Sequence, residues 1–199
     1  AEDGIRDYDV TGVQTCALPI CQDAGGLDYF DTSLEGFWRS FYAAAFIAPP
    51  FALLLALRYS HGIVAAGPLR YAAIEAIAYV IAWVAFPVAM LMVARMLDRD
   101  KPFIRFIVAY NWAAVLQNAL YLPIPMMGMT GMLSVTAASG LGMVALLMIL
   151  TYTWFITKTA LEVSSAAAAG IVALDLGLGI FIMPVADSKI GRAACRGRG

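Results

Sequence analysis

YAAIEAIAYVIAWVAFPVAMLMVA, residues 71–94, contains one charged side chain, Glu75, in a run long enough to cross a membrane. A bilayer core about 30 Å thick requires roughly 20 mainly apolar helical residues, each adding about 1.5 Å. Pro87 is expected to bend this helix without ending it, because neighbouring membrane helices satisfy the carbonyl groups that a proline frees. The run therefore predicts a transmembrane helix.

The rest of the chain has the same apolar character. Hydrophobic residues make up 62% of its 199 residues and charged residues 14%, with a mean hydropathy of +0.79. Soluble domains contain about 45–50% apolar and about 25% charged residues. We therefore expect an all-α fold, a polytopic transmembrane helical bundle of about five spans. The expected spans are residues 38–57, 71–94, 103–122, 138–157 and 166–185.

The two ends of the chain differ from the apolar segment between them, because they resemble translated adapter DNA. VTGVQTCALPI, residues 10–20, can be back-translated into DNA that resembles a widely used sequencing-library adapter. IGRAACRGRG, residues 190–199, is similar to IGRASCRERV, the translation of the opposite adapter. Foreign segments are set aside before a fold is considered. We expect residues 1–21 and 189–199 to be adapter-derived and disordered, with a five-helix transmembrane domain over residues 22–188 and a missing natural N-terminus.

The sequence predicts no enzyme, metal site or cofactor. Cys16 and Cys195 lie inside the two adapter-like segments and Cys21 at the junction, so no thiol chemistry is expected. HExxH, GxSxG and glycine-rich phosphate-binding motifs are absent, and His61 is the only histidine. The net charge of −1, with no basic cluster on a soluble domain, argues against nucleic acid as a partner.

Basic residues are divided unequally between the two sides of the predicted bundle. The side opposite the N-terminus carries Arg58 and Arg70. The N-terminal side carries six basic residues, namely Arg39, Arg95, Arg99, Lys101, Arg105 and Lys158. Cytoplasmic loops of membrane proteins are enriched in Lys and Arg. We therefore expect a cytoplasmic N-terminus and an external C-terminus, in a bacterial inner membrane.

Asp175, in the last predicted span, is the most informative single residue. A carboxylate at the centre of a bilayer costs at least about 2.5 kcal/mol and normally faces a partner or water. Two roles are open. Asp175 acts in proton or cation movement, or it is structural, either protonated or hydrogen-bonded to an amide of the third span.

Those amides are Asn111, Gln117 and Asn118. Asn111 and Asn118 are seven residues apart and so share a helix face. Buried amides either hold helices together, at about 0.6 kcal/mol per contact, or line a polar path. Glu75 either joins Asp175 and these amides in one polar network within the membrane or lies at the level of the lipid headgroups.

Three segments next to the spans also leave alternatives open. LDYFDTSLEGFW, residues 27–38, is an interfacial helix capped by Ser33 or Asp31, or a cap leading straight into the first span. PIPMMGMTGM, residues 123–132, is an apolar outer loop or a Cu(I) ligand set. Lys158 and Glu162 share a helix face if the fourth helix continues.

ARMLDRDKPFIRFIVAYNWAAVL, residues 94–116, and the five-span layout resemble the Yip family of small membrane proteins, linked in eukaryotes to Rab GTPases and vesicle traffic. That family often has a glycine-rich turn before its third span, where this chain has Asp-Arg-Asp-Lys-Pro, and no Rab-binding residue carries over. We expect a non-enzymatic integral membrane protein that acts through helix packing and contacts with lipid, with itself or with other membrane proteins. The alternative is a small transporter or channel subunit that moves protons or cations by way of Asp175.

Overall fold

The computed structural model describes the backbone of residues 30–64 and 66–196, and the side chains as far as residue 181. This part of the chain consists of helices and their connections, without a strand. The helices are α2 (Leu34–Ser40), α3 (Tyr42–Ser60), α4 (Pro68–Met96), α5 (Asp100–Tyr121), α6 (Pro123–Met129), α7 (Val135–Ala160) and α8 (Ser165–Arg196).

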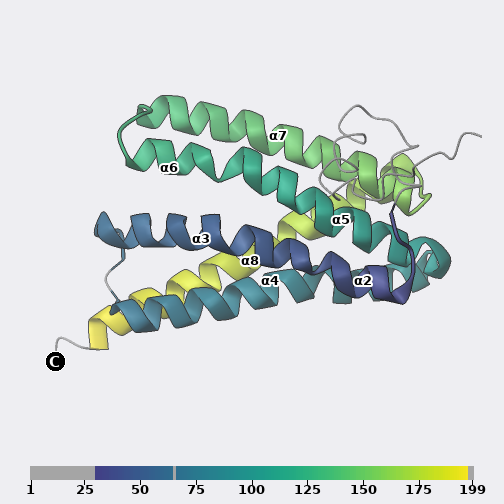
Figure 1. Cartoon of the computed structure of the whole chain (residues 1–199), viewed down its shortest axis with the longest axis horizontal. Coiled ribbons are helices and arrows are strands. Elements are labelled where there is room, and N and C mark those ends of the chain that lie inside the picture. Colours follow the sequence, from purple (N-terminus) through teal and green to yellow (C-terminus); the bar gives the residue numbers. More distant parts are fainter. Residues whose placement is uncertain (1–29, 65, 197–199) are drawn as a thin grey trace, which may run out of the picture.

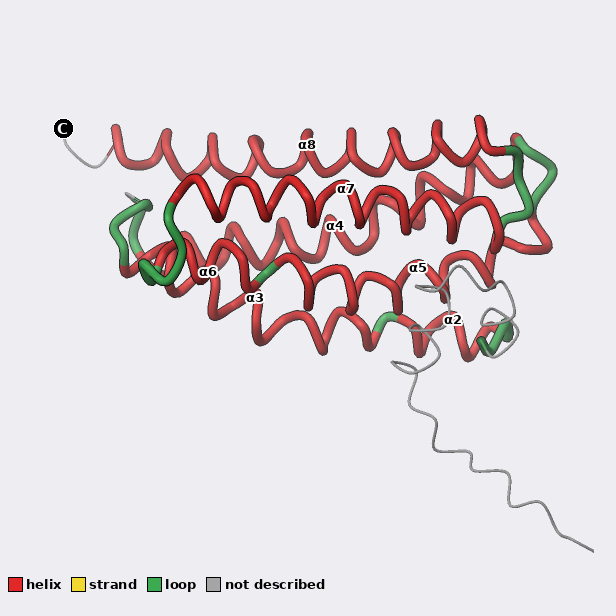
Figure 2. The backbone as a smooth tube through the Cα atoms, turned by 90° about the horizontal axis from the view of Figure 1, so that it is seen from above, coloured by secondary structure: helices red, strands yellow, loops and turns green. Residues whose placement is uncertain are grey.

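The long helices run along one common axis and alternate in direction (Figure 1). The second view shows the same elongated bundle, with α8 along one edge and α3 near the other (Figure 2). α5 is the central element, since it packs against α2, α3, α4, α6 and α7. α8 completes the bundle by packing against α4 and α7.

The main core lies where α4, α5, α7 and α8 meet. Phe86 stacks on Tyr110, with ring centroids 4.4 Å apart and an interplanar angle of 29°. The buried side chains of this core are Phe86, Met90, Phe106, Ile107, Ala109, Ala113, Ile156, Ala160, Leu161 and Ile171.

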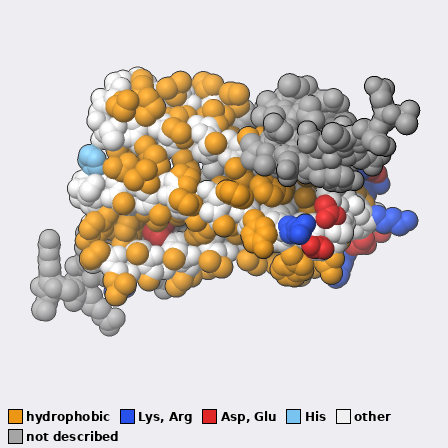
Figure 3. Space-filling model, in the orientation of Figure 1, with side chains coloured by type: hydrophobic (Ala, Val, Ile, Leu, Met, Phe, Trp, Pro, Cys, Tyr) orange, Lys and Arg blue, Asp and Glu red, His pale blue; other side chains and the backbone are white. Residues whose placement is uncertain are grey.

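On the face seen in Figure 3, hydrophobic side chains cover much of the surface between the two ends of the bundle. Three helical segments are long and apolar enough to cross a membrane: Leu34–Ser60, Pro68–Met96 and Val135–Ala160. At most 17% of each apolar window is buried inside the structure, so these segments present their side chains outward. The apolar, all-helical architecture that the sequence predicts is therefore confirmed, and three of the expected spans meet the length and hydropathy of a membrane crossing.

The two remaining long helices, α5 and α8, fall short of that criterion for different reasons. α5 carries Arg105 and three amides, and its polar Asn111 is buried in the bundle. The described side chains of α8 reach only Phe181, so Ser165–Phe181 counts as a shorter apolar helix. α5 covers all but the last residue of the expected span 103–122, and α8 covers the whole of the expected span 166–185.

Charged side chains gather at one end of the bundle, where α4 and α7 finish and α5 begins (Figure 3). Arg105 of α5 donates to the Ala160 carbonyl from Nε at 3.2 Å and from Nη2 at 3.0 Å. It also forms a salt bridge with Glu162. This cluster joins the start of α5 to the end of α7.

The start of α2 resolves one of the open alternatives. Ser33 is its N-cap and accepts a 3.0 Å hydrogen bond from the Gly36 amide, while Asp31 accepts one from the Ser33 amide. Hydrogen bonds from the Ser33 hydroxyl and amide hold the pKa of Asp31 below its ordinary value of 3.8. α2 passes into α3 through the single residue Phe41, so the cap leads straight into the first apolar segment.

Three expectations differ from the structure. The segment after α5 is not a loop: Pro123 occupies the start of α6, where a proline's missing amide donor has no helical partner to lose. α8 continues to Arg196, so residues 189–196 of the tail that was expected to be disordered are helical; KIGRAACR contains no proline and several good helix formers. Residues 1–21 and 197–199 lie outside the described residues.

The third difference concerns Glu162. α7 ends at Ala160, and Glu162 has a φ of 56°, so Lys158 and Glu162 do not share a helix face. Glu162 pairs with Arg105 instead. The Lys158 ammonium lies over the Trp154 ring, 5.2 Å from its centroid.

Candidate ligand-binding cavity

A cavity of about 430 Å³ lies between α3, α4 and α5. Its size falls within the range of small-molecule sites, roughly 300–1,000 Å³. Most of its polar lining comes from side chains that sequence analysis singled out. The ionisable, amide and aromatic residues of its wall are Arg58, Glu75, Asn111, Gln117, Asn118, Phe51, Tyr79, Trp83 and Tyr110.

Asn111 is fully buried in this wall and held in one orientation. Its Nδ2 donates a 2.8 Å hydrogen bond to Ser40 Oγ, and that hydroxyl donates its single proton to the Phe37 carbonyl at 2.7 Å. Ser40 can therefore only accept from Asn111, which fixes nitrogen on that side of the amide. Asn111 Oδ1 is buried and accepts no hydrogen bond from the described residues.

The other two amides also use their nitrogen atoms within the protein. Gln117 Nε2 donates to Thr153 Oγ1 of α7 at 3.0 Å, and Asn118 Nδ2 donates to the Ala114 carbonyl of its own helix at 2.8 Å. Asn111 and Gln117 thus link neighbouring helices, which is one of the two roles that the sequence predicts for these amides. Asn118 bonds within its own helix.

Glu75 lies on α4 and is buried against the same cavity, 8% exposed. Glu75, Tyr79 and Trp83 follow one another at four-residue spacing, which places them along one face of α4.

Aromatic rings form the wall between α3 and α4. Phe51 of α3 stacks on Tyr79 of α4, with centroids 5.1 Å apart and an interplanar angle of 27°. Trp83 follows, 6.2 Å from Tyr79. The Tyr79 hydroxyl donates to the Ala44 carbonyl at 2.7 Å, which fixes the ring across the seam between the two helices.

Asp175 lies on α8 and does not line this cavity. Its Oδ1 accepts a 2.7 Å hydrogen bond from the hydroxyl of Tyr110, which is a cavity-lining residue. The expected amide partner is therefore replaced by a phenol. Sequence analysis missed Tyr110 because a tyrosine in an apolar span resembles an interfacial or core aromatic, although its position next to Asn111 was a usable signal.

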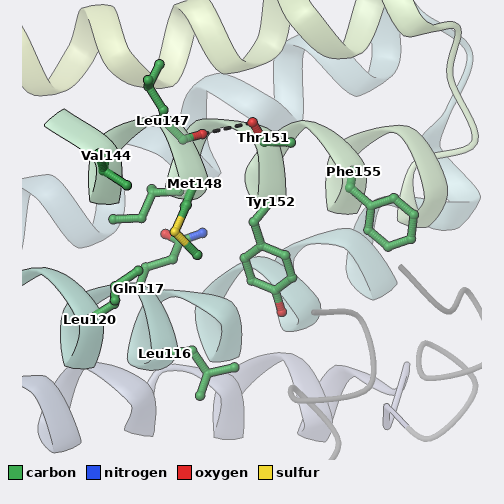
Figure 4. Close-up of a pocket in the computed structure, with 10 residues that line it drawn as sticks. Leu116, Gln117, Leu120, Val144, Leu147, Met148, Thr151, Tyr152 and Phe155 are labelled. Atoms are coloured by element: carbon green, nitrogen blue, oxygen red, sulfur yellow. Dashed lines mark hydrogen bonds between the residues drawn. The ribbon is translucent and has the colours of Figure 1, made fainter. Parts of the chain in front are cut away.

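A second, more apolar hollow of about 610 Å³ lies between α5 and α7 (Figure 4). Leu116, Gln117 and Leu120 of α5 line one side of it, and Met148 and Tyr152 belong to α7 on the other. Gln117 borders both hollows, so its hydrogen bond to Thr153 lies where they approach each other.

The basic residues predicted as topology determinants lie apart from the cavity. Arg105 belongs to the α5–α7 cluster and Lys158 to the Trp154 contact described above. Arg95 is in the last turn of α4, and Arg99 and Lys101 flank the start of α5. All five belong to the same end of the bundle.

The described side chains bring no three His, Cys, Asp or Glu residues together in a way that could hold a metal ion. Comparison of the chain with protein-family models, with curated proteins and with solved structures gave no match.

Proposed function

We propose that this chain is a non-enzymatic, multi-pass integral membrane protein that binds a small polar molecule in the cavity between α3, α4 and α5. The observation that carries the proposal is the cavity itself, whose wall combines aromatic rings with the polar side chains of Glu75, Asn111 and Asn118. Small-molecule sites are mainly apolar hollows with a few polar groups that fix the orientation of the ligand.

A binding role is favoured over catalysis by the composition of the wall. As the described residues define it, the lining includes no serine, cysteine, histidine or lysine. Serine, cysteine and lysine are common nucleophiles and histidine is a common base, and the two tyrosine hydroxyls of the wall are bonded to Ala44 and Asp175.

We infer that five helices cross the membrane, α5 and α8 among them. α5 is central in the bundle and bordered by α3, α4 and α7, so it would cross wherever they cross. Its lower hydropathy comes partly from amides that face other helices and the cavity. The resemblance to the Yip family implies the same number.

The basic end of the bundle supports a cytoplasmic N-terminus and an external C-terminus in a bacterial inner membrane. A reporter fused to the C-terminus tests this orientation. We expect an external signal in the natural sequence and a shift toward inversion when Arg99 and Lys101 are both changed to Glu. A cytoplasmic C-terminus in the natural sequence would contradict the five-span arrangement.

Access of a polar solute to the cavity can be measured through Trp83. In protein whose other three tryptophans are changed to Phe, reconstituted in lipid nanodiscs, acrylamide should quench Trp83 fluorescence. Ala114→Leu narrows the cavity and should reduce the quenching constant. Ala73→Leu, at an exposed position of the same helix as Trp83, is the matched control and should not change it. Equal quenching in all three proteins would contradict a solute-accessible cavity.

A transport function is the second candidate, favoured by the hydrogen bond between Asp175 and Tyr110 at the cavity wall. Proton or cation flux into proteoliposomes tests it. Flux that the unmodified protein supports and that disappears in Asp175→Asn supports transport. If the unmodified protein shows no flux, or if the substitution leaves the flux unchanged, Asp175 has no role in transport.

A further inference from the structure

We propose that the hollow between α5 and α7 holds an acyl chain of an anionic phospholipid, whose phosphate group is bound by Lys158 at the end of α7. The inference requires that α7 crosses the membrane, and it does not depend on the small-molecule cavity between α3, α4 and α5. Its support comes from the exposure of the hollow, its length, the hydrogen bonds of its polar residues and the position of one cation.

The hollow is open toward the outside of the bundle. Its volume is about 610 Å³, and aliphatic and aromatic side chains form most of its wall. Leu120 of α5 is 43% exposed, and Leu147 and Met148 of α7 are 57% and 56% exposed. α7 is one of the helices that are long and apolar enough to cross a membrane. Where α7 crosses, the hollow therefore faces the hydrocarbon chains of the lipid.

Two polar side chains of the wall donate their hydrogen bonds within the protein. The Thr151 hydroxyl donates to the Leu147 carbonyl at 2.8 Å (Figure 4). Gln117 Nε2 donates to Thr153 Oγ1 at 3.0 Å. Because these donors are already used, the hollow suits a hydrocarbon chain better than a solute that needs hydrogen-bond donors.

The length of the hollow matches the thickness of one leaflet. On α7 its wall extends from Val144 to Phe155, which is about 17 Å at about 1.5 Å per residue. The hydrocarbon core of a bilayer is about 30 Å thick, so the acyl chains of one leaflet fill about 15 Å of it. An acyl chain that lies along α7 therefore extends from one end of the hollow to the other.

Lys158 lies just beyond the hollow on the same face of α7. It follows Phe155 by three residues and Thr151 by seven, and residues at these spacings share a helix face. Its ammonium lies over the Trp154 ring, 5.2 Å from the centroid. Trp154 Nε1 donates to the Ser165 carbonyl at 3.1 Å, which fixes the ring at the turn between α7 and α8. Tryptophan and lysine are typical of the headgroup level of a membrane, so this end of the hollow is where a phosphate would lie.

The charge of Lys158 complements an anionic lipid. The ion pairs among the described residues join Glu35 to Arg39 and Glu162 to Arg105, and neither includes Lys158. An ammonium has three donors, and contact with a ring on one side leaves donors for phosphate oxygens. An anionic headgroup is favoured over a zwitterionic one, because further basic residues lie at this end of the bundle and cations near the membrane surface attract anionic lipid.

Quenching of Trp154 by brominated lipid measures the occupancy of the site. The reporter protein is the full chain with its other three tryptophans changed to Phe. It is reconstituted in phosphatidylcholine nanodiscs that contain a small fraction of phosphatidylglycerol or of phosphatidylcholine brominated in one acyl chain. We expect the anionic lipid to bind with about fivefold higher affinity, which is the effect of one lysine near the membrane surface.

Substitutions test the cation and the hollow separately. Lys158→Gln should abolish the preference for the anionic lipid, whereas Lys158→Arg should keep it. Lys101→Gln is the matched control, because Lys101 is a basic residue of the same bundle end that lies in the first turn of α5. Thr151→Phe fills the hollow and should lower the affinity for the anionic lipid. Thr136→Phe, at another exposed threonine of α7 that does not line the hollow, should not.

Three results would overturn the proposal. They are equal affinities of the two lipids for the reporter protein, equal losses in Lys158→Gln and Lys101→Gln, and an affinity that Thr151→Phe leaves unchanged. The second result would indicate general attraction to the basic end, and the third would place the lipid outside the hollow. If neither lipid quenches Trp154, the hollow is not a lipid site, and a dimeric protein would then show that a second copy covers it. The quenching of Trp83 by acrylamide is independent of all these outcomes, so the small-molecule cavity is tested separately.

Discussion

The Tyr110 hydroxyl donates a 2.7 Å hydrogen bond to Asp175 Oδ1, which joins the central helix α5 to the last helix α8. The Tyr110 ring is held by its stack on Phe86 of α4. A carboxyl group within an apolar helix therefore has a fixed partner, supplied by the helix that also forms the cavity wall.

Tyr110→Phe tests this bond, because it keeps the ring stack and removes only the hydroxyl. We expect a loss of about 1–3 kcal/mol in the free energy of unfolding, since the half-buried Asp175 loses its donor. Unfolding in mixed micelles of dodecyl maltoside and SDS measures it. Tyr121→Phe, at an exposed tyrosine of the same helix, is the control.

The double variant Tyr110→Phe, Asp175→Leu sharpens the test. When both partners become apolar, no polar group is left unsatisfied, so the double variant should be more stable than Tyr110→Phe alone. A Tyr110→Phe protein as stable as the unmodified chain would show that the bond contributes nothing.

Ser40→Ala addresses the orientation of Asn111. The substitution removes the acceptor of the Asn111 amide nitrogen, so a fully buried amide has neither of its atoms paired. We expect a destabilisation of about 1–3 kcal/mol. Ser60→Ala is the matched control, because Ser60 is exposed and its hydroxyl likewise bonds to the carbonyl three residues earlier. Equal effects of the two substitutions would contradict the role given to Ser40.

The positions of these polar residues could be predicted in part from the sequence. Glu75, Asn111, Gln117 and Asn118 stand out because polar side chains in apolar helices need partners, and all four line one cavity. Their individual partners could not be predicted. Ser40 and Thr153 lie on other helices, and the relative rotation of packed helices is set by side-chain interlocking across the bundle, which no single helix encodes.

The helices, like the polar residues, could be predicted only in part from the sequence. Apolar runs located all the long helices, because hydropathy is a local property of the chain. The ends were less predictable. Pro123 in the sequence indicates a break, yet a proline also suits the first turn of a new helix, and α6 begins there. Glu162 ends α7 through a left-handed backbone without the glycine that usually marks such a position.

Gly36→Ala should destabilise the start of α2. Alanine normally stabilises a helix relative to glycine by about 1 kcal/mol. At Gly36, however, the added Cβ would lie 2.2 Å from the Asp31 carbonyl oxygen and 2.7 Å from Asp31 Cγ. The Asp31 and Ser33 cap must then move, so we expect a lower midpoint of thermal unfolding.

Gly140→Ala is the counterpart for this prediction. Gly140 is inside α7, and nothing lies within 4 Å of an added Cβ. This substitution should raise stability by about 0.5–1 kcal/mol, through helix propensity alone. If Gly36→Ala also raised stability, the close approach of Asp31 to α2 would be wrong.

Arg105 should contribute more to stability than its salt-bridge partner Glu162. Glu162 is 57% exposed, and an ion pair of that kind contributes about 0.2–1 kcal/mol. Arg105 also donates two hydrogen bonds to the Ala160 carbonyl at the end of α7, an acceptor without a helical partner. Arg105→Ala removes both interactions, so we expect its cost to exceed that of Glu162→Ala by about 1 kcal/mol or more.

Salt separates the two contributions of Arg105. Raising the ionic strength from about 0.01 M to about 1 M shortens the screening length from about 30 Å to about 3 Å, so the cost of Glu162→Ala should shrink. The Arg105→Ala cost should persist to a large extent, because hydrogen bonds to a carbonyl are short-ranged. Arg105→Lys is the intermediate variant, since an ammonium keeps the charge but lacks the planar fork that supplies two donors to one oxygen. Equal costs for Arg105→Ala and Glu162→Ala, both removed by salt, would mean that the end of α7 depends on charge alone.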